Sequence, residues 1–285
     1  MWNDEITILL VTYYADFDKI TSLIEKKIKN FRILIVENSS DKNLKSKIEG
    51  KFPNAQVILS KTNTGQVGGI NLGLSLIKTK YCLYMDLDVN FDQKIILKLL
   101  QYAKKIQNFI ILCPPHHKTE YNKKFFLKRR YKKIDKMKIV HGHFFFFNMN
   151  KVKQVGLYDE KIFIYYDETE YCLRCNKLNE NIYLIRDIKV NHEDAKSTIN
   201  NINSKIMHIR HWHLMWGKVY VNKKYYGYLY TLLIIIPDLI EGFTKMFIYL
   251  LFNKYKSKIY KYRLLGLIES LINKPSWRRP DELIN

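Results

Sequence analysis

Short apolar runs alternate with amphipathic segments over the first part of the chain. Runs rich in β-branched residues predict strands at residues 6–13, 31–36, 55–59 and 81–85. Between these runs, apolar residues recur at helical spacing and predict helices at residues 18–30, 42–52 and 65–77. Strands that alternate with helices form a mostly parallel sheet with helices on both faces. The expected fold class is therefore α/β.

The pattern changes after Leu112. Residues 118–138 are dense in Lys and Arg and predict an exposed segment, and residues 139–148 return to strand character. A helix preceded by an acidic turn is expected at 163–176. Beyond about residue 200 the chain is rich in aromatic residues and lysine, with long apolar helical stretches. We therefore expect one α/β domain over 1–215 and a helical region over 216–285.

Polar residues stand at the ends of the predicted strands, where ligands bind in parallel sheets. They include Tyr13 and Glu37, and Asp86-Leu-Asp88 follows the strand at 81–85. Side chains at i and i+2 of a strand point the same way, so both aspartates should face one crevice. Two such carboxylates suit a hard cation that bridges to phosphate oxygens. An ordinary solvated turn is the alternative.

Two further polar segments allow a structural and a functional interpretation. Residues 37–41 (ENSSD) suit a turn and a helix N-cap, or a polar edge that hydrogen-bonds a nucleobase. Residues 63–73 contain four glycines, which either form a plain turn into a helix or let the backbone approach a ligand closely. This segment matches neither the P-loop nor the Gly-x-Gly-x-x-Gly pattern.

Three carboxylates crowd into the segment from Asp167 to Glu170, ahead of Arg174. They could begin a helix and complement its macrodipole. Crowded carboxylates also raise one another's pKa, which suits a general base.

The cysteines and histidines predict no metal centre of their own. Cys172 and Cys175 lack the second pair that a structural zinc site needs, so we expect them on the core side of a helix. His208, His211 and His213 are clustered without accompanying acids, which favours an interface or a phosphate contact over metal ligation.

The composition is strongly basic. There are 48 Lys and Arg residues against 27 acidic residues, a net charge of +21, which predicts an anionic partner such as nucleic acid, a membrane surface or a phosphorylated substrate. The acidic start and the short first apolar run do not fit a signal peptide, and four cysteines do not suggest a disulfide scaffold. A cytoplasmic location is expected.

Together these motifs resemble glycosyltransferase family two, and most of all its rhamnosyltransferase-like members. The resemblance spans about residues 5–215 and rests on the order of five motifs, namely Thr12-Tyr13, Glu37-Asn38-Ser39-Ser40, Asn63-x-Gly65 to Asn71-x-Gly73, Asp86-x-Asp88, and Tyr166-Asp167-Glu168-Thr169-Glu170 with Arg174. It implies a single catalytic domain of the A-type nucleotide-diphospho-sugar transferase fold.

The resemblance also implies a role for each matching position. The nucleotide-sugar site would comprise Thr12, Tyr13, Glu37, Asn38, Asn63, Gly65, Asn71, Asp86 and Glu170. Asp86 and Asp88, with His192 as a further contact, would hold Mg²⁺ or Mn²⁺ on the donor diphosphate. By alignment Glu168 would be the catalytic base, and Asp167 is the alternative because the family usually has Glu-Asp-x-Asp here.

The activity implied is metal-dependent, inverting transfer of one sugar. The donor would be a dTDP- or UDP-sugar of rhamnose type, and the acceptor a hydroxyl of a glycan or lipid-linked glycan in cell-surface polysaccharide synthesis. The Gln-x-x-Arg-Trp motif of processive synthases is missing, because Trp277-Arg278-Arg279 lacks the glutamine. Two alternatives stay open. A basic nucleic-acid-binding protein explains the charge but not the acidic motifs, and a non-catalytic scaffold would bind the nucleotide-sugar without turnover.

The C-terminal region carries a long apolar run at 230–252. Pro237 and the charges Asp238, Glu241 and Lys245 interrupt it, which disfavours a bilayer-spanning helix. After Pro237 the apolar residues share one helical face, which suits either packing on the catalytic domain or a helix in the membrane interface. Basic and aromatic flanks favour peripheral attachment to the inner face of the cell membrane, with an anionic membrane surface, and no nucleic acid, as the partner.

Overall fold

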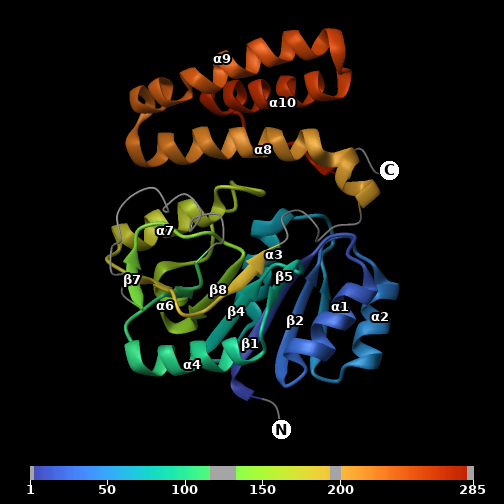
Figure 1. Cartoon of the computed structure of the whole chain (residues 1–285), viewed down its shortest axis with the longest axis vertical. Coiled ribbons are helices and arrows are strands. Elements are labelled where there is room, and N and C mark those ends of the chain that lie inside the picture. Colours follow the sequence, from blue (N-terminus) through green and yellow to red (C-terminus); the bar gives the residue numbers. More distant parts are fainter. Residues whose placement is uncertain (1–2, 116–132, 193–199, 281–285) are drawn as a thin grey trace. The chain divides into compact units, whose positions relative to one another are not determined.

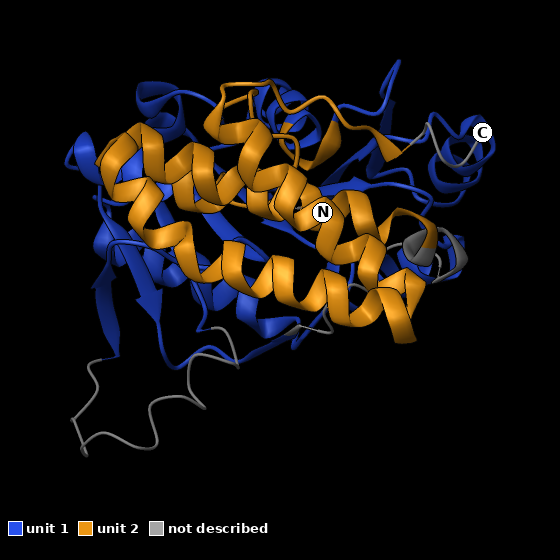
Figure 2. Cartoon of the chain, turned by 90° about the horizontal axis from the view of Figure 1, so that it is seen from above, with its two compact units in different colours: residues 1–64, 68–158, 171–199 blue, residues 65–67, 159–170, 200–285 orange. Residues whose placement is uncertain are grey.

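The computed structural model (Figure 1) describes residues 3–115, 133–192 and 200–280. The chain divides into two compact units, drawn in different colours in Figure 2. The first comprises Met1–Thr64, Gly68–Tyr158 and Tyr171–Ile199, and the second comprises Gly65–Val67, Asp159–Glu170 and Asn200–Asn285.

The first unit is built on an eight-stranded sheet with the order β3-β2-β1-β4-β8-β6-β9-β7. Its strands are β1 (Asn3–Thr12), β2 (Phe31–Glu37), β3 (Ala55–Leu59), β4 (Tyr81–Met85), β6 (Ile111–Cys113), β7 (Ile134–Met137), β8 (Phe144–Asn148) and β9 (Ile182–Ile185). The first four in spatial order pair in parallel, as do β6 and β9, while β7 and β8 run antiparallel to their neighbours. The expected α/β class with a mostly parallel sheet is confirmed.

Helices and one small ladder complete this unit. They are α1 (Phe17–Leu23), continued by the π-helical turn η1 (Ile24–Ile28), then α2 (Lys42–Lys51), α3 (Gly65–Leu76), α4 (Lys94–Ile106), α6 (Met149–Val155) and α7 (Asp167–Lys177). The first residues of α3, at positions 65–67, and of α7, at positions 167–170, belong to the second unit. A two-stranded ladder joins β5 (Val89–Phe91) to β10 (Val190–His192).

The central strand β1 is buried on both faces. Ile6, Ile8 and Leu10 point into one large apolar cluster. On the other face, α3 lies so close that a Cβ at Gly73 would come within 2.3 Å of the Leu9 side chain. Burial on both faces explains the continuous apolar run of β1, since a half-exposed strand would alternate with polar residues.

The second unit is dominated by three long helices, α8 (Asn200–Tyr226), α9 (Tyr228–Phe252) and α10 (Lys254–Leu271). They share a small core that contains Val219 of α8, Ile235 of α9 and Leu267 of α10. α8 runs without a break through positions 215 and 216, so the helical region begins upstream of the expected boundary.

The expectation that Pro237 interrupts the apolar run is wrong, because α9 continues through it as one helix. A proline inside a helix removes one backbone donor, and here Ile235 before it and Leu239 after it pack in the core that α9 shares with α8 and α10. In the part of the chain that the structure describes, no helix combines the length and the apolarity that crossing a bilayer requires.

Candidate active site

The carboxyl ends of β1 and β2 bring together several residues expected to bind a nucleotide. Thr12 pairs with Glu37 in the parallel register, and the Asn38 backbone N–H donates to the Thr12 carbonyl at 2.8 Å. The Thr12 side chain is 3% exposed, and its Oγ1 has no hydrogen-bond partner within the described residues. Tyr13 follows directly and packs edge-on against Tyr14, whose φ of 46° is unusual for a large residue.

Glu37 hydrogen-bonds the backbone of the turn that follows it. Its fully buried carboxylate accepts hydrogen bonds from the backbone N–H of Ser39 at 2.9 Å and of Asp41 at 2.8 Å, and also from the Ser39 hydroxyl. Asp41 in turn caps α2 by accepting from the N–H groups of Asn43 and Leu44. The turn-and-cap interpretation of this segment is therefore confirmed, and the nucleobase contact of Glu37 stays a prediction.

Amide side chains tie the glycine-rich segment to its surroundings. Asn38 accepts a hydrogen bond from the Thr64 hydroxyl at 3.1 Å, at the start of α3. Asn71 donates to the Tyr158 carbonyl at 3.0 Å and accepts from the Tyr158 N–H at 2.9 Å. Asn63 lies half-buried in the loop before α3. Asn71 thus has a structural role in the first unit, and its nucleotide contact stays a prediction.

Asp86-Leu-Asp88 forms the turn that joins β4 to β5. The argument from strand alternation is wrong here, because β4 ends at Met85, the last residue paired with β8. Leu87 is 8% exposed and enters the core, which leaves both aspartates half-buried on the turn. The Tyr84 hydroxyl donates to Asp86 Oδ1 at 2.8 Å, and the Asp86 N–H donates to the His143 carbonyl at 3.0 Å. Hydrogen bonds therefore fix both the side chain and the backbone of Asp86.

The ladder between β5 and β10 brings His192 to this turn. The backbone of His192 pairs with Val89, the residue directly after Asp88. Two segments about a hundred positions apart in sequence therefore meet at the expected metal site.

Two carboxylates suit a cation whose remaining ligands are water or the substrate. Among the described residues, no three His, Cys, Asp or Glu side chains form a preformed metal site. Mg²⁺ typically binds one or two carboxylates and completes its coordination with water and substrate phosphates. Asp86 and Asp88 meet that requirement, and the metal itself stays a prediction.

The acidic segment begins α7 in the second unit. The expected helix start at 163 is wrong, because Tyr165 and Tyr166 have φ values of 65° and 64° and the helix begins at Asp167. Such values are strained for large side chains, at about 1–3 kcal/mol each, and strain of this kind clusters at functional sites. Asp167 is 6% exposed, whereas Glu168 is only partly buried. Burial, together with the carboxylates of Asp238 and Glu168, raises the pKa of the Tyr166 hydroxyl.

Two glycines allow other parts of the second unit to approach this strained loop. Gly65 has a φ of 74°, and a Cβ there would lie 2.4 Å from the Phe163 carbonyl oxygen. A Cβ at Gly217 in α8 would lie 2.9 Å from the Tyr165 carbonyl oxygen and 3.1 Å from the Tyr166 Cβ. Gly217 therefore sets the distance between α8 and the loop that precedes Asp167.

We expect Gly217→Ala to lower the rate of sugar-nucleotide turnover by roughly tenfold to 10²-fold, because displacing a catalytic group by about 1 Å costs that much. The measurement is kcat at saturating nucleotide-sugar. Gly50→Ala is the matched control, since a Cβ at Gly50 in α2 meets nothing within 4 Å. Equal rates for the two variants would contradict the role of Gly217.

Glu170 is committed to an ion pair. Its fully buried carboxylate accepts hydrogen bonds from Lys224 Nζ at 2.8 Å and from the Tyr225 hydroxyl at 2.9 Å. Lys224 also binds Asp159 at 2.6 Å. Burial alone would lower the pKa of Lys224, but its hydrogen bonds with the two carboxylates outweigh burial and raise that pKa. Glu170 therefore anchors the start of α7, and Glu168 and Asp167 are left as candidates for the base.

Removing this lysine should destabilise the protein. We expect Lys224→Met to lower the free energy of unfolding by roughly 2–3 kcal/mol, below the value for a fully buried pair because Lys224 is 35% exposed. Thermal or urea denaturation measures the loss. The double variant Lys224→Met/Glu170→Gln should recover part of it, and Lys245→Met, which breaks an exposed pair with Glu241, should cost less than about 0.5 kcal/mol. A loss as small for Lys224 as for Lys245 would count against the pair.

Sequence reasoning did not find Tyr84, Lys224 or Tyr225. A tyrosine two residues before an aspartate is a local signal, but Lys224 lies 54 positions from Glu170 and leaves none. Arg174 donates to the Val155 carbonyl at 3.1 Å. All four cysteines are buried thiols, as expected for Cys172 and Cys175.

The histidine cluster also packs inside the second unit. His213 is 1% exposed, and its ring nitrogens contact Ser276 Oγ at 3.1 Å and the Arg278 carbonyl at 2.9 Å. Burial lowers its pKa to about 3 and that of His208 to about 4, so both rings are neutral at pH 7. A neutral, buried His213 does not suit a phosphate contact.

Comparison with known proteins identifies similar chains. The model of a family described as glycosyl transferase family 2 matches residues 18–165, more than half of the chain. The dTDP-rhamnosyl transferase RfbF of Shigella flexneri is 27% identical over 224 residues, which cover 72% of this chain and 75% of that protein.

Solved structures share the fold at low sequence identity. The mannosyltransferase PcManGT from Pyrobaculum calidifontis, in complex with GDP-Man and Mn²⁺, matches with a TM-score of 0.60 and 11% identity, over 96% of this chain and 89% of that one. GalNAc-T7 with UDP, GalNAc and Mn²⁺ matches with a TM-score of 0.54 and 11% identity, over 78% of this chain and 52% of that one. These likenesses support the expected A-type glycosyltransferase fold.

Proposed function

This chain belongs to glycosyl transferase family 2, and on that premise we propose that it transfers one sugar from a nucleotide-diphospho-sugar to a hydroxyl group of a glycan or lipid-linked glycan. Similarity to a dTDP-rhamnosyl transferase supports a dTDP-sugar of rhamnose type as the donor, with a UDP-sugar as the alternative. The acceptor class fits a role in cell-surface polysaccharide synthesis.

The observation that carries this proposal is the Asp86-Leu-Asp88 turn. It stands at the carboxyl end of β4, is held by Tyr84 and lies beside the backbone of His192. The buried Thr12 Oγ1, which lacks a partner within the described residues, supports a donor nucleoside at the neighbouring strand ends. The ends of β1, β2 and β4 are where ligands bind in open α/β sheets.

The chemistry follows from these residues. A bound Mg²⁺ or Mn²⁺ would stabilise the negative charge of the departing nucleoside diphosphate. Glu168, with Asp167 as the alternative, takes the proton of the acceptor hydroxyl as its oxygen attacks the anomeric carbon. The bond from that carbon to the diphosphate oxygen breaks in the same displacement, so the configuration inverts. The missing glutamine of the Gln-x-x-Arg-Trp motif at Trp277-Arg278-Arg279 supports transfer of a single sugar without processive synthesis.

Donor hydrolysis tests the proposal most directly. The purified protein is incubated with dTDP-, UDP- and GDP-sugars, with Mn²⁺ or Mg²⁺ and with EDTA, and release of the nucleoside diphosphate is measured. We expect slow hydrolysis of a dTDP- or UDP-sugar that EDTA abolishes. Metal-dependent binding without turnover would favour the non-catalytic scaffold, and binding of nucleic acid in place of any donor would favour the other alternative.

We also propose that the protein attaches peripherally to the inner face of the cell membrane through α9. Seven large apolar side chains recur along α9 at alternating spacings of four and three residues, and each is at least 47% exposed. We call them the α9 stripe: Leu229, Leu233, Ile236, Ile240, Phe243, Phe247 and Leu250. An exposed patch of this extent is rare on a monomeric protein and marks an interaction site.

The residues that flank the α9 stripe support a membrane as its partner. Tyr226, Tyr228 and Tyr230 are about half-exposed before or at its start, and Tyr255 is half-exposed after its end. Tyrosine favours the boundary between lipid and water. Exposed lysines follow Phe252, and each contributes about 1 kcal/mol of attraction near an anionic surface.

We expect the protein to float with anionic vesicles and to be released in large part by high salt or alkaline carbonate. Salt screens the lysine contribution over about 8–10 Å but leaves the apolar contribution unchanged. Flotation with anionic and neutral vesicles measures this, and the matched variant Leu233→Ser/Ile240→Ser removes two exposed residues of the stripe. Equal recovery of the variant and the parent protein would show that α9 is only a packing element. If detergent extracts the protein and neither salt nor carbonate does, the result would point to insertion across the bilayer.

A further inference from the structure

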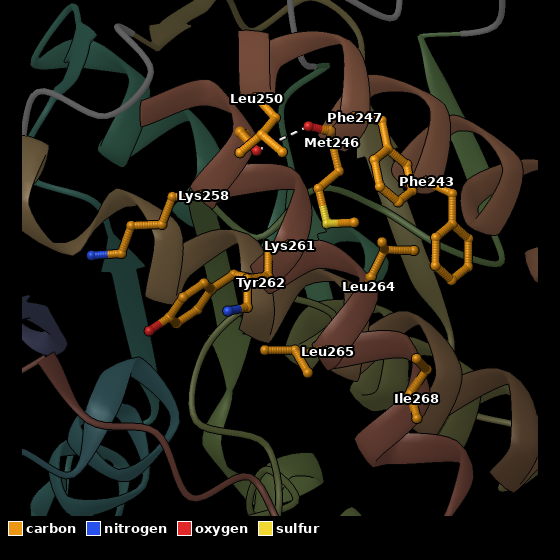
Figure 3. A pocket seen from close by; sticks show the side chains of 11 residues that line it. Phe243, Met246, Phe247, Leu250, Lys258, Lys261, Tyr262, Leu264, Leu265 and Ile268 are labelled. Atoms are coloured by element: carbon orange, nitrogen blue, oxygen red, sulfur yellow. Dashed lines mark hydrogen bonds between the residues drawn. The ribbon is translucent and has the colours of Figure 1, made fainter. Parts of the chain in front are cut away.

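A groove lies between α9 and α10 and shares residues with the C-terminal part of the α9 stripe. It has a volume of about 700 Å³, within the range of sites that hold small molecules. Phe243, Met246, Phe247 and Leu250 line it from α9. Figure 3 shows these side chains opposite those of α10, which include Tyr262, Leu264, Leu265 and Ile268.

The groove is lined mainly by apolar side chains, and the Ser257 hydroxyl that also lines it is hydrogen-bonded. Leu264 is 4% exposed and forms part of the floor. The Ser257 hydroxyl donates to the Met246 carbonyl at 2.9 Å, which ties α10 to α9. A floor without unsatisfied polar groups suits a hydrocarbon chain, because a polar ligand would lose its hydrogen bonds to water there.

The rim of the groove is positively charged. Lys258 and Lys261 line it, and their ammonium groups are seen in Figure 3. Lys254 and Lys256 are exposed just before them on α10. In the described part of the chain, none of these four lysines has a carboxylate partner, whereas Lys218, Lys224 and Lys245 each have one. Four unneutralised cations disfavour a second copy of this chain as the occupant and favour an anion.

We propose that this α9–α10 groove holds one acyl chain of an anionic phospholipid, whose phosphate binds the ammonium groups of Lys258 and Lys261. The proposal rests on the membrane attachment proposed above and deepens it from contact with a surface to capture of a single lipid. The groove shares Phe243, Phe247 and Leu250 with the α9 stripe, so a lipid could enter it from the bilayer that the stripe contacts. The captured lipid would account for the minor fraction of the protein that stays at the membrane after salt has screened the surface charge.

Lipid retention in a non-ionic detergent tests this proposal, since detergent removes the charge of the bilayer surface. The full-length protein is mixed with phosphatidylglycerol and examined by native mass spectrometry. We expect one retained lipid per chain. Lys258→Gln/Lys261→Gln should weaken retention about 30-fold, from the loss of two lysine–phosphate interactions. Lys254→Gln/Lys256→Gln, which removes the same charge outside the groove, should stay within about threefold of the parent protein.

Two further measurements locate the lipid. A phosphatidylglycerol with a photoreactive acyl chain should crosslink to residues 243–250 and 258–268. Met246→Trp or Leu265→Trp, either of which fills the groove, should abolish these crosslinks in protein that circular dichroism shows to be folded. Equal retention in both lysine pairs, or crosslinks spread along the α9 stripe in the filled variants, would overturn the proposal. Displacement of phosphatidylglycerol by lower concentrations of an isoprenoid phosphate would overturn it in favour of an acceptor-lipid site.

The outcomes separate this proposal from those on which it depends. Loss of flotation in every preparation would refute membrane attachment as a whole. Flotation without a retained lipid would refute the groove alone. Donor hydrolysis should be unchanged in the lysine variants, because neither pair is part of the donor site.

Discussion

Metal-dependent transfer should be lost when either aspartate of the Asp86-Leu-Asp88 turn is replaced by alanine. We expect Asp88→Ala and Asp86→Ala each to lower the rate by about 10³-fold or more, because a cation that stabilises the leaving diphosphate contributes several kcal/mol to the transition state. The measurement is release of nucleoside diphosphate at saturating Mn²⁺ by the purified variants.

A matched control separates this effect from loss of folding. Asp4→Ala removes an exposed carboxylate that pairs with Arg32 at 2.7 Å, and it should leave the rate unchanged. Circular dichroism should show folded protein in all three variants, since Asp86 and Asp88 lie on a turn outside the core. Full activity in either site variant would refute the metal assignment.

Glu168→Gln should retain donor binding and lose most of the turnover. The amide keeps the shape of the side chain and removes its basicity, and loss of a general base typically costs about 10²–10⁴-fold in rate. We expect kcat for transfer to an acceptor to fall by that amount while the Kd for the nucleotide-sugar stays the same.

Asp167→Asn provides the comparison that assigns the base. Asp167 is 6% exposed, whereas Glu168 is only partly buried and so more accessible to an acceptor hydroxyl. Glu25→Gln, an exposed site paired with Lys51, controls for the change of charge. A crippled Asp167→Asn beside an active Glu168→Gln would move the assignment by one residue.

Local sequence signals predicted most of the regular structure of the first unit. The strands at 55–59 and 81–85 have the expected bounds, because a short β-branched run between turn residues leaves little freedom. The predicted start of α7, at residue 163, lies four residues before the observed start at Asp167. Two consecutive tyrosines with positive φ are a property of the surrounding fold, and nothing in Phe163–Tyr166 itself disfavours a helix.

The candidate site was predictable at the level of motifs, but not in its contacts. The Asp86-Leu-Asp88 turn could be located because it follows an apolar strand, although its geometry depends on where pairing with β8 stops. The partner of Glu170 lies on α8 and could not be inferred from local spacing. Periodicity likewise placed the apolar residues of α9 on one face, but could not decide whether α8 and α10 would cover that face.

The buried thiols of Cys82 and Cys113 give the first unit a built-in chemical reporter. They lie on β4 and β6, and burial raises the pKa of each thiol far above its ordinary value. Because the thiolate is the nucleophile that attacks an alkylating reagent, neither cysteine can react at neutral pH until its strand opens to solvent. The alkylation rate of these two cysteines, measured separately from that of Cys172 and Cys175, therefore reports how often these strands separate. A bound donor that contacts the strand ends should slow this rate, so ligand binding can be followed without any label.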